Sequence, residues 1–393
     1  MLALREVADD PDLGADAAAW APALPTAGVR LQRVWRCDAA VLRPKLVVAV
    51  PACNEDARIE ACFGALARTL SDVPDAGVLL LVNNTSDDTA SRALFAAIGR
   101  GVPAVIVDVA TVPGMATAGW ARRMALDLAA HWTRGNGVLM TTDADGRVDP
   151  PWALANLAAL EAGADLVCGR VECDPDEAAL LPASLHRRDV LDAEYWALAV
   201  ELDARLDPRP HDPWPHHGQS PGASLALCTR DYLAVGRLPT PDAGEDRAFA
   251  AAIEASDLRI RHSNAASVTV SCRVAGRARG GMADLSAARI ADRDSPADEL
   301  LRPAVMTARR ATARHALRVA WQGRGDAAAI FVQLGVPAAV AGACLRSATF
   351  GAAWARVEAA SPAFQSPRLH PSDLVRELPL LRQLVIAATE RHP

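Results

Sequence analysis

The chain has 393 residues, of which 51% are hydrophobic and 22% are charged, so it can bury a sizeable globular core. We expect one large domain with appendages. The formal net charge of −6 gives no electrostatic basis for gripping many phosphates, so nucleic acid is not an expected partner. The eight cysteines form neither a CxxC pair nor a metal-knuckle spacing, which favours reduced thiols in a cytoplasm. Lys45 is the only lysine, which excludes a phosphate loop ending in GK[ST] and Schiff-base chemistry.

No segment has the pattern of an export signal or a membrane span. The N-terminus carries Arg5 among several acidic residues and lacks the basic-then-apolar order of a signal peptide. The only long uncharged stretch, 327–345, is rich in alanine and is interrupted by a glycine and a proline at 335–337. We interpret it as two short helices that break at this point. The sequence therefore predicts a cytoplasmic protein with no stable membrane span.

The first half of the chain alternates between strand and helix patterns. Residues 1–44 are rich in alanine and proline and predict an extension, whereas Lys45 opens a series of apolar runs that suit strands buried on both faces. These strands are expected at 46–50, 78–82, 102–107 and 137–142, and the clearest helices at 59–70 and 116–131. The alternation predicts an α/β fold, with a mostly parallel sheet flanked by helices and ligands bound beyond the carboxyl ends of the strands.

The second half is less regular. It is expected to contain a helix at 185–206, a Pro/His-rich loop at 208–221, a short strand at 224–228, a helix opening at 244–246, and an antiparallel-looking strand pair at 258–261 and 267–272. From about Asp298 onward the sequence is rich in alanine and arginine, which predicts a helical C-terminal region without an evident chemical motif.

Asp143-Ala144-Asp145 directly follows the fourth predicted strand and places two carboxylates on one side of an extended segment. Mg²⁺ or Mn²⁺ is commonly held by one or two carboxylates and completes its shell with water and substrate phosphates. The pattern therefore suits a metal, held chiefly by Asp145, that neutralises a leaving nucleoside diphosphate. The alternative is a solvated Asp-x-Asp-Gly turn, which is common in proteins.

Two other polar loops follow strands and should reach the same edge of the sheet. Pro51-Ala52-Cys53-Asn54-Glu55 follows the first strand, and Asn83-Asn84-Thr85-Ser86-Asp87-Asp88 follows the second. Both are dense in hydrogen-bonding groups that can read a base and a ribose. Each could instead cap the helix that comes after it.

Gly244-Glu245-Asp246 opens an amphipathic helix, so its carboxylates lie near the helix N-terminus, where negative charge is stabilised. A carboxylate kept ionised at the edge of a pocket could take a proton from an acceptor hydroxyl. The alternative for both acids is simple helix capping.

Basic and imidazole side chains complete the set of candidates. Arg273, Arg277 and Arg279 form a basic loop with several glycines, and guanidinium groups match diphosphate oxygens, although a solvated arginine cluster is the alternative. His262 is a candidate third metal ligand, with a structural histidine as the alternative. The three histidines of the 208–221 loop are expected on the acceptor side or exposed.

Taken in this order, these motifs resemble family 2 glycosyltransferases over about Lys45 to Met282. Pro51-Ala52-Cys53-Asn54-Glu55 resembles the family's Pro-x-x-Asn-Glu opening, Asp143-Ala144-Asp145 matches its metal- and donor-binding DxD motif, and Gly244-Glu245-Asp246 resembles its acceptor-side acidic pair. The resemblance implies a GT-A fold and metal-dependent transfer of a sugar from a UDP- or GDP-sugar, with inversion, to an unknown hydroxyl of a small molecule, glycan or lipid-linked acceptor.

The candidate site residues combine this match with the residue patterns described above. Asp246 is the implied base, with Glu245 beside it, and the metal ligands are Asp145, Asp143 and His262. The donor-binding residues are Pro51, Ala52, Asn54, Glu55, Asn84, Asp87, Asp143, Ala144, Arg273 and Arg277. The chain departs from the family after the second strand, where Asn83-Asn84-Thr85-Ser86 replaces the usual acidic pair and Gly-Ser, which puts uracil recognition there in doubt.

The resemblance also gives a domain assignment and leaves two alternative functions open. We assign 1–44 to an N-terminal extension, 45–282 to the glycosyltransferase domain (45–150 nucleotide-sugar half, 151–282 acceptor half) and 283–393 to a helical C-terminal region. A nucleotidyltransferase-like enzyme and a non-catalytic nucleotide-sugar-binding member remain alternatives to a hexosyltransferase-type enzyme. The first would normally open with a Gly-rich loop after the first strand, which Pro51-Ala52-Cys53 lacks.

Overall fold

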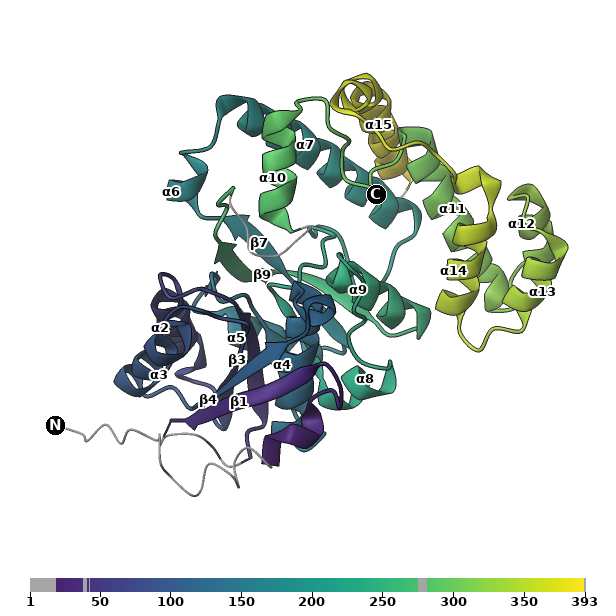
Figure 1. Ribbon diagram of the computed structural model, residues 1–393. Helices are drawn as coiled ribbons and strands as arrows, with labels where there is room; N and C mark the ends of the chain where they lie inside the picture. Colours follow the sequence, from purple (N-terminus) through teal and green to yellow (C-terminus); the bar gives the residue numbers. More distant parts are fainter. Residues whose placement is uncertain (1–18, 38–40, 42, 275–280, 392–393) are drawn as a thin grey trace.

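A single nine-stranded mixed sheet forms the centre of the molecule and carries helices on both faces (Figure 1). The computed structural model describes residues 19–37, 41, 43–274 and 281–391. The strand order is β1-β4-β3-β2-β5-β8-β7-β9-β6. The strands are β1 (Val29–Arg36), β2 (Leu46–Ala52), β3 (Ala76–Asn83), β4 (Ala104–Thr111), β5 (Val138–Thr141), β6 (Arg147–Val148), β7 (Leu166–Cys173), β8 (Leu225–Cys228) and β9 (Ile260–Val270). The predicted α/β fold with a helical C-terminal region is confirmed.

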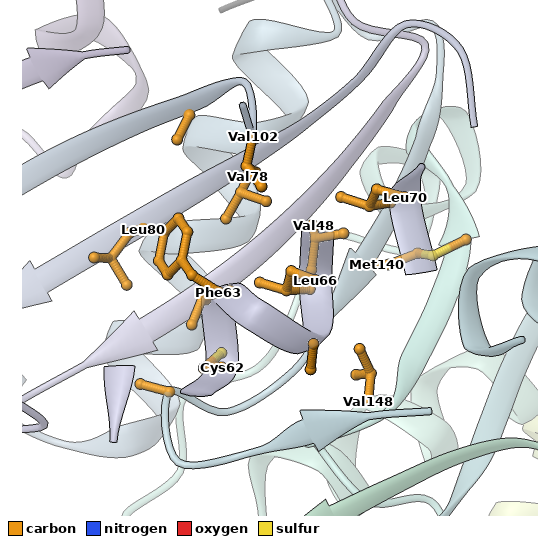
Figure 2. Close-up of a cluster of buried hydrophobic side chains, with 14 of the residues drawn as sticks. Val48, Cys62, Phe63, Leu66, Leu70, Val78, Leu80, Val102, Met140 and Val148 are labelled. Atoms are coloured by element: carbon orange, nitrogen blue, oxygen red, sulfur yellow. The ribbon is translucent and has the colours of Figure 1, made fainter. Parts of the chain in front are cut away.

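The first half of the sheet is parallel, because β4, β3, β2 and β5 run in the same direction. Every residue of β3 is buried, which explains why its sequence is a continuous apolar run without alternation. Helices α2 (Ile59–Leu70), α3 (Thr89–Arg100) and α5 (Trp152–Glu161) contribute to the core on one face, and Figure 2 shows Phe63 and Leu66 of α2 among side chains of β2 and β3. Helices α4 (Ala118–Trp132), α8 (Thr229–Ala234) and α9 (Glu245–Ala255) contribute to the core on the other face.

The second half of the sheet is mixed. Strand β8 lies antiparallel between β5 and β7, and β9 runs parallel to β7. The predicted antiparallel pair at 258–261 and 267–272 is therefore wrong, since one continuous strand spans Ile260–Val270. The expected pair leaves 262–266 between two strands, but β9 passes through the exposed Asn264 and Ala265 with an irregularity beside Gly169. A Cβ at Gly169 would lie 2.2 Å from the Ala266 carbonyl oxygen, so this close approach requires glycine.

One strand comes from the segment assigned to the N-terminal extension. Strand β1 pairs antiparallel with β4 at the edge of the sheet, and a short 3₁₀ turn, η2 (Ala21–Ala23), precedes it. The edge position explains the half-exposed, arginine-rich sequence of β1.

The C-terminal helices form two further cores and lie on the side of the molecule away from α2 and α3 (Figure 1). The remaining helices are α6 (Pro175–Ala178), α7 (Ala183–Leu206), α10 (Met282–Ala291), α11 (Ala304–Trp321), α12 (Ala327–Gln333), α13 (Ala338–Leu345), α14 (Phe350–Ala360) and α15 (Pro371–Arg391). The 327–345 stretch forms two short helices, as predicted. Within the described residues, none of the helices combines the length and apolar character needed to cross a membrane.

A buried ion-pair network joins α7 to α11. Arg314 of α11 contacts Asp203 at 2.6 Å and Asp207 at 2.5 Å, and Arg318 contacts Asp207 at 2.7 Å. Burial would raise the pKa of Asp203, but the guanidinium groups of Arg314 and Arg310 bring it well below its ordinary range. The Asp203 carboxylate therefore stays ionised, and both Asp203 and Asp207 depend on α11 for a positively charged partner.

Candidate functional site

The carboxylate pair lies where the sequence places it, directly after β5. The backbone leaves β5 beside the middle of β2, where the Thr142 N–H donates to the Ala49 carbonyl at 3.3 Å. It turns back where the Gly146 N–H donates to the Asp143 carbonyl at 2.9 Å. Ala144 is buried between the two acids, whose side chains keep 33% (Asp143) and 17% (Asp145) of their exposure. The two carboxylates are thus held at the carboxyl end of the parallel strands and remain partly open to solvent.

Asp143 is neutralised by Arg122 of α4. The Arg122 Nη1 atom lies 3.0 Å from an Asp143 carboxylate oxygen and 2.7 Å from the Gly222 carbonyl, and its Nε lies 3.2 Å from Glu245. Burial alone would lower the pKa of Arg122, but the carboxylates of Asp143 and Glu245 raise it. This buried cation therefore ties the Asp143 loop to the start of α9.

Asp145 has a weaker counterion and a crowded anionic setting. Arg273 contacts Glu55 through two nitrogens at 3.0 and 2.5 Å and reaches Asp145 only at 3.4 Å. Burial, followed by the charges of Asp143 and Glu55, raises the pKa of Asp145 to about 7 in spite of Arg273. Excess negative charge on hard oxygen atoms is the environment that a divalent cation relieves, so Asp145 and Asp143 fit a Mg²⁺ or Mn²⁺ ion.

Hydrogen bonds join the two polar loops that follow β2 and β3. The Asn54 side-chain oxygen accepts a hydrogen bond from the Ser86 N–H at 2.8 Å, and the Asn54 N–H donates to Thr85 Oγ1 at 3.2 Å. The Glu55 N–H donates to Thr89 Oγ1 at 2.7 Å. Asn54 has φ 54, a conformation that asparagine tolerates better than most residues. These contacts give a rigid platform beside the carboxylates, with Pro51 partly exposed and Ala52 buried at the end of β2.

Asp87 and Asn84 act within this platform. Asp87 accepts hydrogen bonds from the N–H groups of Asp56 at 3.1 Å and Thr89 at 3.0 Å. Burial would raise its pKa, but these bonds and the Thr89 hydroxyl lower it. Asn84 bonds Thr111 of β4 through both side-chain atoms, at 2.8 and 2.7 Å. The capping alternative therefore describes Asp87 well, and any contact of either residue with a ligand would be added to these bonds.

The two acids of α9 have different surroundings. Glu245 is buried and pairs with Arg122. Asp246 accepts a hydrogen bond from the Gly222 N–H at 3.0 Å and lines a cavity of about 830 Å³. The helix begins after Gly244 at φ 74, and Asp246 also accepts a hydrogen bond from the Arg247 N–H at 2.8 Å.

The cavity lies between the second half of the sheet and the C-terminal helices. Its walls come from α7, α9, α10, α11 and the 208–221 loop, with Trp196, Arg247 and Met282 among the lining residues. Asp143 and Asp145 are not part of its lining. The lining of the cavity therefore includes Asp246 but neither member of the carboxylate pair.

His262 does not lie beside Asp143 and Asp145, the residues predicted to bind a metal with it. It pairs across the sheet with Cys168, which is level with Leu225 and Thr141 in the next strands. Three strand spacings separate it from Thr141 by about 14 Å. Its Nδ1 lies 2.6 Å from Asp212, and it groups with Asp212 and His216 as ligand-type atoms. The prediction that His262 joins Asp143 and Asp145 is therefore corrected. Arg277 lies outside the described residues.

Sequence reasoning missed Arg122, Asp212 and Gly222. Arg122 precedes Arg123 in a helix, and the pair reads as ordinary solvated charge. Only the crossing of α4 behind β5 reveals that the first of the two arginines is buried and the second is partly exposed. Asp212 and Gly222 belong to a loop whose path has no periodic signal.

No family model and no curated protein sequence matches the chain. Solved structures do match the chain. S. aureus TarS residues 1–349, in complex with UDP-GlcNAc, is 15% identical with a TM-score of 0.43, covering 70% of this chain and 72% of that one.

Two other solved structures match the chain with similar sequence identities and TM-scores. Glucosyl-3-phosphoglycerate synthase from Mycobacterium tuberculosis, in complex with Mn²⁺, UDP and phosphoglyceric acid, is 20% identical with a TM-score of 0.38, covering 64% of this chain and 78% of that one. The mannosyltransferase PcManGT from Pyrobaculum calidifontis, in complex with GDP-Man and Mn²⁺, is 18% identical with a TM-score of 0.38, covering 89% and 87%.

Proposed function

We propose that the chain is a metal-dependent glycosyltransferase that moves a sugar from a UDP- or GDP-sugar to an acceptor hydroxyl with inversion. The observation that carries the proposal is the meeting of the Asp143-Ala144-Asp145 loop with Glu55, Arg273 and Arg122 at one end of the parallel strands. An anionic metal position beside two guanidinium groups is what a nucleoside diphosphate requires. This site rests on contacts between segments far apart in the chain, which a solvated turn would not make.

Different residues would bind the donor and activate the acceptor. Asp145 would hold the divalent cation that neutralises the leaving diphosphate, with Asp143 positioned by Arg122. Arg273 reaches the same place from the end of β9 and can bind diphosphate oxygens. The platform formed by 51–56 and 83–89 would hold the base and ribose.

Asp246 would act on the acceptor. Its carboxylate lines the cavity and, among the described residues, forms no ion pair like that of Glu245 with Arg122, so it can take the proton of an acceptor hydroxyl. The acceptor oxygen forms a bond to the anomeric carbon as the bond from that carbon to the diphosphate breaks. The products are the glycosylated acceptor, the nucleoside diphosphate and a proton on Asp246.

The first test is a screen of UDP- and GDP-sugars for thermal stabilisation of the full chain with Mn²⁺ or after chelation. A bound donor at a hundredfold excess over Kd should add about 2.7 kcal/mol to the free energy of unfolding. We expect stabilisation by one nucleotide class, only with metal, lost in Asp145→Asn and retained in Asp149→Asn. Stabilisation that is equal with and without metal would contradict the proposal.

Product analysis separates the two alternatives. A glycosyltransferase releases a nucleoside diphosphate, whereas a nucleotidyltransferase uses a nucleoside triphosphate and releases pyrophosphate. Release of neither product across a broad acceptor set, with donor binding intact, would favour a non-catalytic binding protein.

A further inference from the structure

A second cluster of ligand-type side chains lies away from the carboxylate pair. Asp212 and His216 come from the Pro/His-rich loop and His262 comes from β9, and one ligand atom from each lies within 4.8 Å of the others. The Asp212 Oδ2 atom is 2.6 Å from His262 Nδ1 and 3.6 Å from His216 Nε2. We propose that these three side chains form a second metal site, of the kind that binds Zn²⁺, on the acceptor side of the molecule.

The donor set and spacing suit such an ion. Two imidazoles and one carboxylate are common ligands of Zn²⁺, with bonds of about 2.1 Å. Tetrahedral bonds of this length place neighbouring ligand atoms about 3.4 Å apart. The Asp212 to His216 separation already has this value within a few tenths of an ångström, and the Asp212 to His262 pair would open by about 0.8 Å.

His216 supplies an independent reason. Its side chain is only 8% exposed, yet within the described part of the chain it makes no hydrogen bond, and its Nδ1 is buried without a partner. The Asp212 oxygen at 3.6 Å is too far for a hydrogen bond to Nε2. The Nε2 atom therefore faces the Asp212 carboxylate without a hydrogen bond to it and is available to coordinate an ion.

The surrounding contacts hold the ligands in place. The backbone N–H of His262 donates to Asp212 Oδ1 at 2.9 Å, which leaves Oδ2 for the ion. The rings of His216 and His262 stack with centroids 5.0 Å apart and an angle of 13° between planes. His217 is engaged differently, because its ring nitrogens face the Cys168 carbonyl at 3.2 Å and the Gln219 N–H at 3.1 Å. Second-shell bonds of this kind orient metal ligands.

The position of the cluster indicates what the ion would do. Asp212, His216 and His262 all line the same cavity as Asp246. Three protein ligands leave a fourth position, which would face this cavity and accept water or an anionic group of an acceptor. The ion would also fasten the 208–221 loop to β9, and so fix one wall of the cavity.

Cobalt titration of the chelator-treated full chain tests the site without any activity measurement. Four-coordinate Co²⁺ bound to imidazole and carboxylate gives a visible absorption far stronger than that of octahedral Co²⁺ in an oxygen site. We expect one equivalent of Co²⁺ to give this absorption, and Zn²⁺ to displace it. The absorption should persist in Asp145→Asn, which removes the carboxylate proposed to hold the donor metal.

Matched variants assign the ligands. His216→Gln and His262→Gln should each weaken Co²⁺ binding by about 100-fold or more, whereas His211→Gln, in the same loop but outside the cluster, should bind as the unaltered chain does. Circular dichroism establishes that each variant is folded, and the titration of the unaltered chain decides the matter if one is not. Absence of the strong absorption in that chain would overturn the proposal. So would its loss in Asp145→Asn together with its retention in His262→Gln.

Discussion

Arg122 and Asp143, which are 21 residues apart in the chain, meet at 3.0 Å behind the end of β5. The same guanidinium contacts Glu245, 123 residues from it in the chain, at 3.2 Å. One buried cation therefore joins the proposed donor loop to the proposed acceptor helix. It also leaves Asp145, and not Asp143, as the carboxylate with the weaker counterion.

Replacement of Arg122 should be strongly destabilising, because it leaves two carboxylates without their cation. We expect Arg122→Met to lower the free energy of unfolding by about 3 kcal/mol, measured by urea denaturation. Arg92→Met, which removes a surface pair with Glu60, should cost less than about 1 kcal/mol. Adding Glu245→Gln to Arg122→Met should recover part of the lost free energy of unfolding. If the Arg122→Met chain is as stable as the unaltered one, Arg122 does not stabilise the fold by joining Asp143 to Glu245.

The two acids of the DxD motif should differ in metal binding. Asp143 already has a guanidinium at 3.0 Å, whereas Arg273 reaches Asp145 at 3.4 Å while paired with Glu55. We expect Asp145→Asn to weaken Mn²⁺-dependent donor binding by more than Asp143→Asn, as measured by calorimetry. Equal losses in the two variants would mean that both carboxylates ligate the ion alike.

The raised pKa of Asp145 makes the stability of the metal-free chain depend on pH. In the folded chain this carboxyl holds its proton up to about pH 7, whereas its ordinary pKa is 3.8, so the folded state binds the extra proton between these values. Stability from this group therefore falls as pH rises from about 4 to 7. Asp145→Asn should raise the Tm of the chelated chain more at pH 8 than at pH 4. An equal gain at both values would exclude this origin, and Asp149→Asn serves as the control.

Replacement of Asp246 should lower kcat without weakening donor binding. Asp246→Asn keeps the size of the side chain and its bond to Gly222 but removes the base, so kcat should fall by about 100-fold or more with donor affinity nearly unchanged. Asp242→Asn, at an exposed position before the helix, should leave kcat unchanged. Turnover by Asp246→Asn within a fewfold of the unaltered chain, measured with the true acceptor, would move the role of base to another group.

The sequence predicts the parallel half of the sheet well, because strands buried on both faces are continuous apolar runs that tolerate few other interpretations. It misses β1, whose half-exposed edge position gives a mixture of arginine and apolar residues. It divides β9 at 262–266, where the exposed Asn264 and Ala265 belong to an irregularity within one strand. Periodicity reports which faces are buried, but it does not report which strand is the neighbour.

The sequence likewise predicts some of the candidate site residues and misses others. The position of Asp143 and Asp145 follows from the end of a strand, and their convergence with Glu55 follows from the parallel order. Arg122 could not be found, because its burial depends on the helix crossing behind β5. His262 was identified as a ligand-type residue but assigned to the wrong group, since its neighbours depend on the β8 strand inserted between β5 and β7.

The pairing of α7 with α11 has a consequence for synthesis on the ribosome. Asp207 of α7 meets Arg314 of α11, which is translated 107 residues later. At about 5–20 residues per second, this carboxylate waits about 5–20 s for its partner. During that interval α7 must keep its acids in water, because burying them alone is prohibitive. The parallel strands up to β5 can assemble in the meantime, so the wall of the cavity to which Arg314 contributes can be completed only after them.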